Sequence, residues 1–282
     1  MAKVYWHADG GNWSDHATHW FNATDGGGGG HGAAPGTDDN AIFDANSFDN
    51  VSQTVTIDAT ATCLAMTWTG ATNTPTITQA ADLEISGSLT TIAAMVWTST
   101  AFSIYFEGTG NVTTNGLTIG CRIYVDNTAT NITLIDALNI TGKQLGISRG
   151  TIDTNDQTVT CATFATTGAG TRTLDLGAST INCTTWTLSG SNLTLTEGTS
   201  TIKVTGTGAF TGGGETYNNV ELNGTAHTIS GSNTFRKLSF GCCPDYNLHR
   251  YNYSDFHYTS IHRVVRQSKN SSRDINSRLD NN

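Results

Sequence analysis

An eight-residue unit that occurs three times places the strongest constraint on the fold of this chain. Residues 183–190 read CTTWTLSG, residues 161–168 read CATFATTG, and residues 63–70 read CLAMTWTG. Each unit alternates large apolar residues with small or hydroxyl residues and ends in glycine, which is typical of a short strand followed by a turn. The copies that begin at Cys161 and Cys183 lie 22 positions apart. A fixed period of strands without helix predicts stacked β coils, because one repeat cannot bury its apolar face alone.

The composition favours an all-β fold and argues against several partners. Only 13% of the 282 residues are charged and glycine supplies 31 positions, while Thr, Asn and Ser dominate the body. Such a mixture favours strands and turns over helices. The formal net charge of -9 argues against nucleic acid as a partner, since little positive charge is present to neutralise phosphates. No run of about eighteen apolar residues occurs and the start has no apolar secretory stretch, which predicts neither a membrane span nor export by that route.

Short strands at close spacing predict a single-stranded parallel β-helix, or β-solenoid. Between residues 75 and 240, strand-like runs of three to five residues alternate with Gly-Thr, Gly-Ser and Asn-Gly turns. Strands this short do not form long hairpins, whereas three of them per coil fit both the strand length and the period. A β-sandwich is the main alternative. It does not explain the regular placement of the cysteines.

Three of the six cysteines, Cys63, Cys161 and Cys183, open the repeat units. Equivalent residues of neighbouring coils stack on one another, so we expect a ladder of small buried thiols rather than a disulfide framework or a metal site. Strand alternation further predicts that Cys161 and Cys183 point into the coil interior one above the other, with Phe164 over Trp186 beside them.

The N-terminal part differs in composition from the body. Trp6, Trp13 and Trp20 recur at intervals of seven, and a glycine run at residues 26–30 follows them. An open solenoid end exposes unpaired backbone and apolar core. We therefore expect residues 1–53 to form an aromatic cap with a glycine-rich loop, and residues 54–241 to form the solenoid.

The opening also resembles known protein families. The motifs that carry the resemblance are Tyr5-Trp6, GGNWSD at residues 10–15, His19-Trp20, the glycine run, PGTDD at residues 35–39, FDANS at residues 43–47 and TVTID at residues 54–58. Their order is similar to the start of β-solenoid proteins among bacteriophage tail and fibre proteins, and of autotransporter-associated repeat surface proteins. The resemblance covers about the first seventy residues. It implies the β-solenoid architecture and, as in fibres of this kind, a homotrimer.

Candidate catalytic and binding residues occur in the sequence as isolated groups. The acidic residues of the body show no paired spacing of the glycosidase kind and are interpreted as turn and face positions; they are Asp126, Asp136, Asp153, Asp156, Asp175, Glu197 and Glu221. Arg122, Arg149 and Arg172 either line one face that grips an acidic polymer or are solitary charges that prevent edge pairing.

The N-terminal segment holds two further groups of polar residues. His16 and His19 lack a second ligand pair with zinc-like spacing, which favours histidine packed in the cap. Asp38, Asp39 and Asp44 are compatible with a calcium loop, but they lack its alternating ligand spacing and its terminal glutamate.

Residues 242–282 break the pattern of the body. They are crowded with Asp, Asn, His and Tyr, whose codons all have A in the middle and a pyrimidine last. Read one nucleotide later, such codons specify Thr, Ile or Met. Alternation of Thr and Ile with other residues is typical of the solenoid body. We therefore interpret the tail as an out-of-frame continuation without packed structure. The alternative is an authentic tail, in which six basic against four acidic residues give a charge of +2 that suits nucleic acid or a partner.

These observations predict a non-enzymatic structural protein of a phage virion appendage, which supplies a rigid scaffold or an attachment surface. Its expected partners are other virion proteins or itself. The alternative is a polysaccharide-binding or polysaccharide-degrading β-helix protein or adhesin, located on the virion or at the bacterial cell surface and extracellular, with a surface glycan as partner. No cofactor, metal, nucleic acid or membrane is expected to take part.

Overall fold

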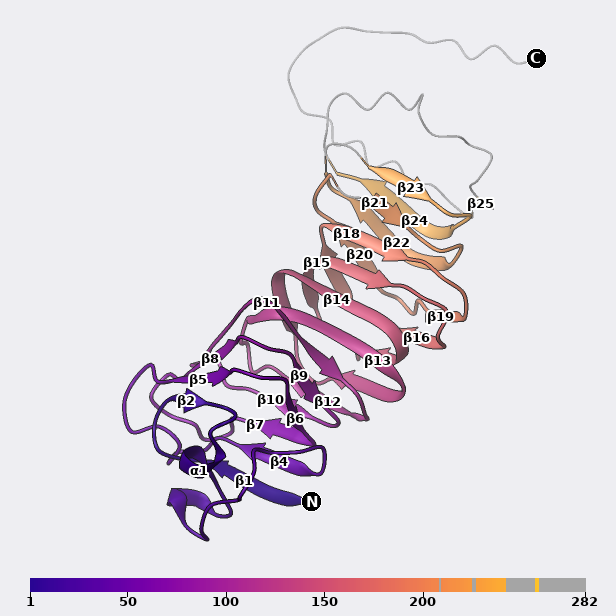
Figure 1. Ribbon diagram of the computed structural model, residues 1–282. Coiled ribbons are helices and arrows are strands. Elements are labelled where there is room, and N and C mark those ends of the chain that lie inside the picture. The colour runs from indigo at the N-terminus through magenta and orange to yellow at the C-terminus, as the bar shows by residue number, and fades with distance from the viewer. Residues whose placement is uncertain (208, 225–226, 242–256, 259–282) are drawn as a thin grey trace, which may run out of the picture.

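The computed structural model describes residues 1–207, 209–224, 227–241 and 257–258, and these residues form almost only β structure. Strands make up 54% and helix 3%, and parallel stacked coils form a β-solenoid of about nine turns. Figure 1 shows the coils following one another in sequence order, from the indigo N-terminal end to the orange β23 (Thr228–Ser230) and β24 (Thr234–Phe240). The predicted fold class is confirmed.

The strands of successive coils form three faces, which we number in the order that the chain visits them from residue 54 onward. The first face contains β2 (Gly11–Asn12), β5 (Thr54–Ile57), β8 (Thr76–Gln79), β17 (Thr180–Cys183), β20 (Thr201–Val204) and the ends of β22 (Thr216–Leu222) and β24. The second contains β6 (Ala61–Cys63), β9 (Leu83–Ile85), β18 (Thr185–Leu188), β21 (Ala209–Thr211) and β23. The third contains β1 (Ala2–Trp6), β4 (Asp39–Ile42), β7 (Ala65–Thr67), β10 (Leu89–Thr90), β12 (Gly110–Thr113), β16 (Arg172–Asp175) and β19 (Leu193–Thr196).

Four longer strands continue around corners from one face to the next. They are β11 (Val96–Phe106), β13 (Ile119–Leu134), β14 (Leu138–Asp153) and β15 (Val159–Thr166). β13 pairs with β11 and β12 before it and with β14 after it, always in parallel. The middle of the solenoid is therefore a continuous ladder in which a residue is fixed by its neighbours one coil above and one coil below.

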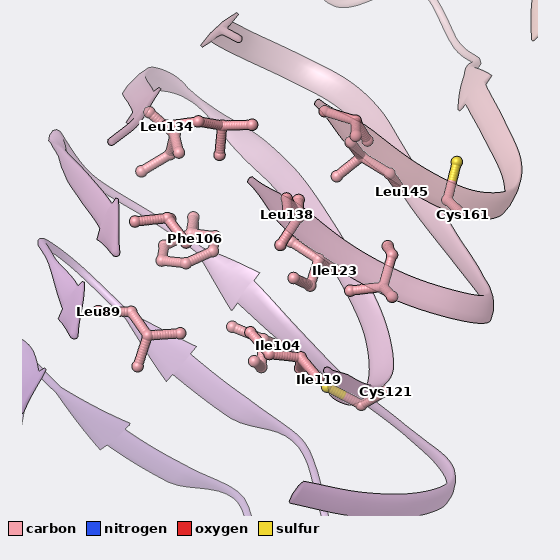
Figure 2. Packing of buried hydrophobic residues seen from close by; sticks show 14 of the residues in the cluster. Leu89, Ile104, Phe106, Ile119, Cys121, Ile123, Leu134, Leu138, Leu145 and Cys161 are labelled. Atoms are coloured by element: carbon pink, nitrogen blue, oxygen red, sulfur yellow. The ribbon is translucent and has the colours of Figure 1, made fainter. Parts of the chain in front are cut away.

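Strand alternation gives the solenoid its core. In β5 the two threonines face outward while Val55 and Ile57 are fully buried. Because the strands pair in register, apolar residues of one coil stack on apolar residues of the next. One column on the second face runs through Ala61, Leu83, Ile104, Ile123, Leu145, Phe164, Trp186, Phe210 and Ile229. Figure 2 shows several of these side chains pointing into the coil interior.

Phe164 and Trp186 occupy neighbouring rungs, as their spacing predicts. They are direct register partners, their ring centroids lie 4.5 Å apart and the rings are stacked. The glycines that close the three repeat units, Gly70, Gly168 and Gly190, have φ of 88°, 99° and 91°. Only glycine adopts this left-handed region without strain. The glycine of each unit is thus required by a corner of the coil.

The cysteine ladder differs from the prediction at Cys63. Cys161 and Cys183 lie on the first face, where the preceding residues of β15 and β17 pair in register. Cys63 lies on the second face, opposite Ile85. The separation of Cys63 from Cys161 is not a whole number of 22-residue coils, and the same alternation recurs on every face. Similar sequence therefore does not specify which face a unit occupies.

The cysteines in the described part of the chain are buried free thiols: Cys63, Cys121, Cys161 and Cys183. Burial raises the pKa of Cys63, Cys121 and Cys161 to about 12, and it raises the pKa of Cys183 as well. Such thiols behave as small apolar residues and are inert, because the thiolate is the reactive form.

The N-terminal aromatic residues pack together over the first coil. Trp6, Trp13 and Trp20 are 1%, 3% and 0% exposed, and Trp20 meets the other two edge-on at centroid distances of 5.1 and 4.7 Å. Phe43 links this cluster to the coil below, because its ring stacks on that of Trp68 at 3.8 Å. The cluster thus shields the apolar interior from water at this end.

Residues 1–53 are also part of the solenoid itself. β1 pairs with β4, β4 pairs with β7, and β2 pairs with β5, all in parallel. The remaining elements here are α1 (His16–His19), β3 (Trp20–Phe21) and η1 (Thr24–Gly26), with β3 antiparallel to β1. The segment therefore supplies the first rungs of the ladder as well as its cover.

The interpretation of residues 242–282 as an aberrant tail falls outside the described residues, except at β25 (His257–Tyr258), which pairs in parallel with the start of β24. Within the described residues, no helix has the length and apolar character needed to span a membrane.

Candidate functional site

The acidic residues singled out in the sequence mostly stabilise turns or pair with a cation. Asp136 accepts the backbone N–H of Thr114 at 2.7 Å, and Asp156 accepts that of Ala178 at 2.5 Å. Asp153 and Asp175 close turns of their own in the same way. The other three form ion pairs, namely Asp126 with Arg149, Glu197 with Arg236 and Glu221 with Lys203. Each therefore has a local structural partner.

The three arginines do not line one face. Arg149 is exposed and pairs with Asp126 at 3.2 Å. Arg172 is fully buried, and its guanidinium donates to the carbonyl oxygens of Gly170, Ser189 and Ser191. Arg122 lies at the corner between the first and second faces. The hypothesis of a single basic face is therefore wrong, since each arginine has a different environment.

The polar residues of the N-terminal segment are likewise dispersed. His19 is buried and stacks on Trp6 with ring centroids 4.4 Å apart, whereas His16 is exposed. Oδ2 of Asp39 lies 3.5 Å from Nε2 of His31. Asp44 accepts the Asn46 N–H at 2.9 Å and the Thr24 hydroxyl at 2.8 Å, and Asp38 is exposed. Within the described ranges, no three His, Cys, Asp or Glu side chains converge as a metal site.

The described surface is hollowed at the corner between the first and second faces. On β11, Thr98 pairs with Gly120 and Ser103 pairs with Arg122. Four residues of β11, 99–102, therefore lie opposite a single residue of β13, Cys121. Two coils further on, Ile140 pairs with Cys161 and Gln144 with Thr163, so residues 141–143 face only Ala162. Both strands bulge outward here, because the extra residues have no partner in the ladder.

The tight corner of β13 lies between these two bulges and forms the floor of a pocket. This corner pocket has a volume of about 390 Å³ and is lined by residues 100–102, Arg122, residues 142–144 and residues 162–163. Figure 2 shows the inner side of the same corner, where Ile119, Cys121 and Ile123 fill the coil interior. The hollow therefore opens outward, away from the core.

Two cations hold the walls of the corner pocket. Arg122 donates from Nη2 to the carbonyl oxygen of Ala101. Lys143 reaches from the second bulge to the first and donates from Nζ to the Ser99 carbonyl oxygen at 3.1 Å. The first bulge is closed on itself, since Ser99 Oγ accepts the N–H of Phe102 and donates to its carbonyl oxygen. Guanidinium has five N–H donors and ammonium three, so both cations keep donors for a ligand.

Two tyrosines extend the pocket along the outer side of the second face. Tyr105 and Tyr124 are register partners whose rings stack with centroids 5.3 Å apart. Tyr124 lies two residues after Arg122, hence on the same side of the strand. Its ring lies against Gly146, where a Cβ would meet Cδ1 of Tyr124 at 2.4 Å. Glycine at this position leaves room for the Tyr124 ring.

Acidic residues border the far side of the tyrosine pair. Glu84 is the register partner of Tyr105, and Asp82 accepts the backbone N–H of Ser103 at 2.9 Å. Burial, with a contribution from the charge of Asp82, raises the pKa of Tyr105. The phenol therefore stays protonated and can donate a hydrogen bond.

Sequence reasoning found Arg122 but missed Lys143, Gln144, Tyr105 and Tyr124. The two tyrosines lie 19 positions apart rather than 22, and the bulge of β11 that accounts for this difference has no distinct sequence signature. The alternating run around each tyrosine was the available signal, because it places both side chains outward on neighbouring coils.

Comparison of the chain with protein-family models, with curated proteins and with solved structures gives no match.

Proposed function

We propose that this chain is a non-enzymatic structural protein of a phage virion appendage, in which the solenoid is a rigid scaffold between other virion proteins or other copies of itself. The β-solenoid fold is consistent with a structural or surface protein. The resemblance of the opening to tail and fibre proteins supports the virion as location. A homotrimer is the expected assembly by the same resemblance.

The observation that carries the scaffold role is the unbroken core. The second-face column from Ala61 to Ile229 passes through nine register partners without a polar side chain. Bending the rod would stretch parallel backbone hydrogen bonds on one face and compress packed side chains on another. Close-packed interiors resist such deformation, so force applied at one end is transmitted to the other.

Location and assembly are tested separately. Antibodies against the chain should label an appendage of purified phage particles in electron microscopy, and mass spectrometry of those particles should find its peptides. Absence from purified particles that carry every other structural protein refutes the virion role. Analytical ultracentrifugation of the purified chain then distinguishes a trimer from a monomer.

The corner pocket favours the second candidate function, which is binding of a surface polysaccharide. Such binding is compatible with a scaffold, because an attachment surface must be held rigidly. The residues that line the pocket indicate which kind of polysaccharide would bind there.

A further inference from the structure

We infer that the corner pocket and the adjoining tyrosine pair bind an oligosaccharide that carries a carboxylate. This inference goes beyond the proposed scaffold role, and it holds or fails independently of where the protein resides. The lining of the pocket includes Arg122 and Lys143, and none of its lining residues is acidic. A protein with a formal net charge of -9 thus has a locally cationic hollow.

The shape of the corner places both cations beside any group that enters the pocket. Both bulges project beyond the tight corner of β13, so a group that enters the pocket is flanked on two sides. The hydrogen bonds to Ala101 and Ser99 hold each cation in place with one donor. A planar guanidinium binds carboxylate with two parallel hydrogen bonds, and an ammonium adds a point charge beside it.

The tyrosine pair supplies the second half of the site. A pyranose ring has an apolar face of C–H bonds and a rim of hydroxyl groups. The apolar face packs against an aromatic ring, and the hydroxyl groups form hydrogen bonds with polar groups nearby. Tyr124 is partly exposed on the outer side of the strand next to Arg122, and its phenol and that of Tyr105 are polar ends on apolar bodies. The pocket volume of about 390 Å³ lies within the range of about 300 to 1,000 Å³ that is usual for small ligands.

The acidic border selects against densely charged polymers. Asp82 and Glu84 lie just beyond Tyr105, where they accept hydrogen bonds from sugar hydroxyls but repel phosphates. A nucleic acid carries a phosphate on every nucleotide and needs several neutralising cations. A glycan with one carboxylate per residue or per repeat meets one cationic pocket, and its hydroxyl groups then meet the tyrosine pair and the acidic border.

The test begins with the intact chain on an array of neutral, uronic-acid-containing and sialylated oligosaccharides. We expect carboxylated glycans to be retained and their methyl esters to bind at least about tenfold more weakly, because a hydrogen bond to a charged group contributes about 1.5 to 3 kcal/mol. Titration calorimetry with the best binder then gives the dissociation constant for each variant.

Two variants and a control separate the site from general charge effects. Lys143→Met and Tyr124→Ala should each weaken binding about tenfold or more. Arg149→Gln removes the same charge at an exposed position of another corner and should bind as the unaltered chain does. Circular dichroism confirms that each variant is folded.

Three outcomes overturn the inference. One is failure of every carboxylated glycan to bind, and another is equal affinity of Lys143→Met and the unaltered chain. The third is tighter binding of double-stranded DNA than of any glycan, which would assign the hollow to polyanions in general. None of these results bears on the virion location, so the failure of one proposal is distinguishable from the failure of the other.

Discussion

Replacement of Trp186 by alanine removes the largest side chain of the second-face column. The indole is fully buried between Phe164, at a centroid distance of 4.5 Å, and Phe210, at 6.3 Å. Its Nε1 donates to the hydroxyl of Tyr217 at 3.3 Å, and that hydroxyl donates to the carbonyl oxygen of Gly212 at 2.6 Å. The substitution therefore opens a cavity, breaks two ring contacts along the column and removes a buried donor.

The expected cost is large because the neighbours are held by the ladder. Truncation of a buried tryptophan costs about 3 to 5 kcal/mol, and the lower end applies only where the surroundings collapse into the cavity. Phe164 and Phe210 are fixed by parallel pairing on both sides, so collapse requires breaking backbone hydrogen bonds. Each lost aromatic contact adds about 0.5 to 1.5 kcal/mol beyond its buried area. We expect a loss at the upper end of the range.

Guanidinium unfolding, followed by far-ultraviolet circular dichroism, measures the change in the free energy of unfolding. Solenoids can unfold in sections, so hydrogen exchange of β15 and β21 should accelerate in parallel. Trp186→Phe keeps the stack on Phe164 and should lose less. Val96→Ala, at a side chain that is 49% exposed, should change stability by less than about 0.5 kcal/mol. A loss below about 1 kcal/mol for Trp186→Ala, with unchanged exchange, refutes the column as a source of stability.

Three further predictions follow from the buried groups and the cap. Arg172→Leu removes the buried guanidinium that donates to three part-buried carbonyl oxygens and should cost about 1 to 3 kcal/mol in chemical unfolding. Arg149→Leu should be nearly neutral; equal effects would contradict the role given to Arg172. Deletion of residues 1–53 exposes the ring of Trp68 and the edges of β5 and β7, so light scattering should detect aggregation. A monodisperse, equally stable product would rule out the cap. The four buried free thiols should resist iodoacetamide at pH 8 and react in denaturant, because their folded pKa values lie well above that pH; peptide mass spectrometry that finds any of them alkylated in the folded protein would show that its burial is wrong.

Much of the candidate site was beyond sequence reasoning. Arg122 was noticed as an isolated charge, but its meaning depends on the bulges of β11 and β14 on either side of it. Lys143 contacts Ser99 across 44 positions of sequence, and only the stacking of coils makes them neighbours. A bulge inserts residues without changing the alternation on either side, so its position is invisible until the register of both flanking strands is known.

The sequence alone determined that this chain stacks short parallel strands, because threonine and apolar residues alternate and glycines recur where a left-handed turn is needed. It also determined that Phe164 lies next to Trp186, since 22 positions are one full coil. The tertiary structure decided on which face each unit lies, and so separated Cys63 from Cys161 and Cys183. It also decided that Arg122, Lys143 and two tyrosines meet at one corner. The physical reason is that alternation specifies inside or outside for every residue, whereas the face depends on the summed length of all preceding corners, which no local pattern records.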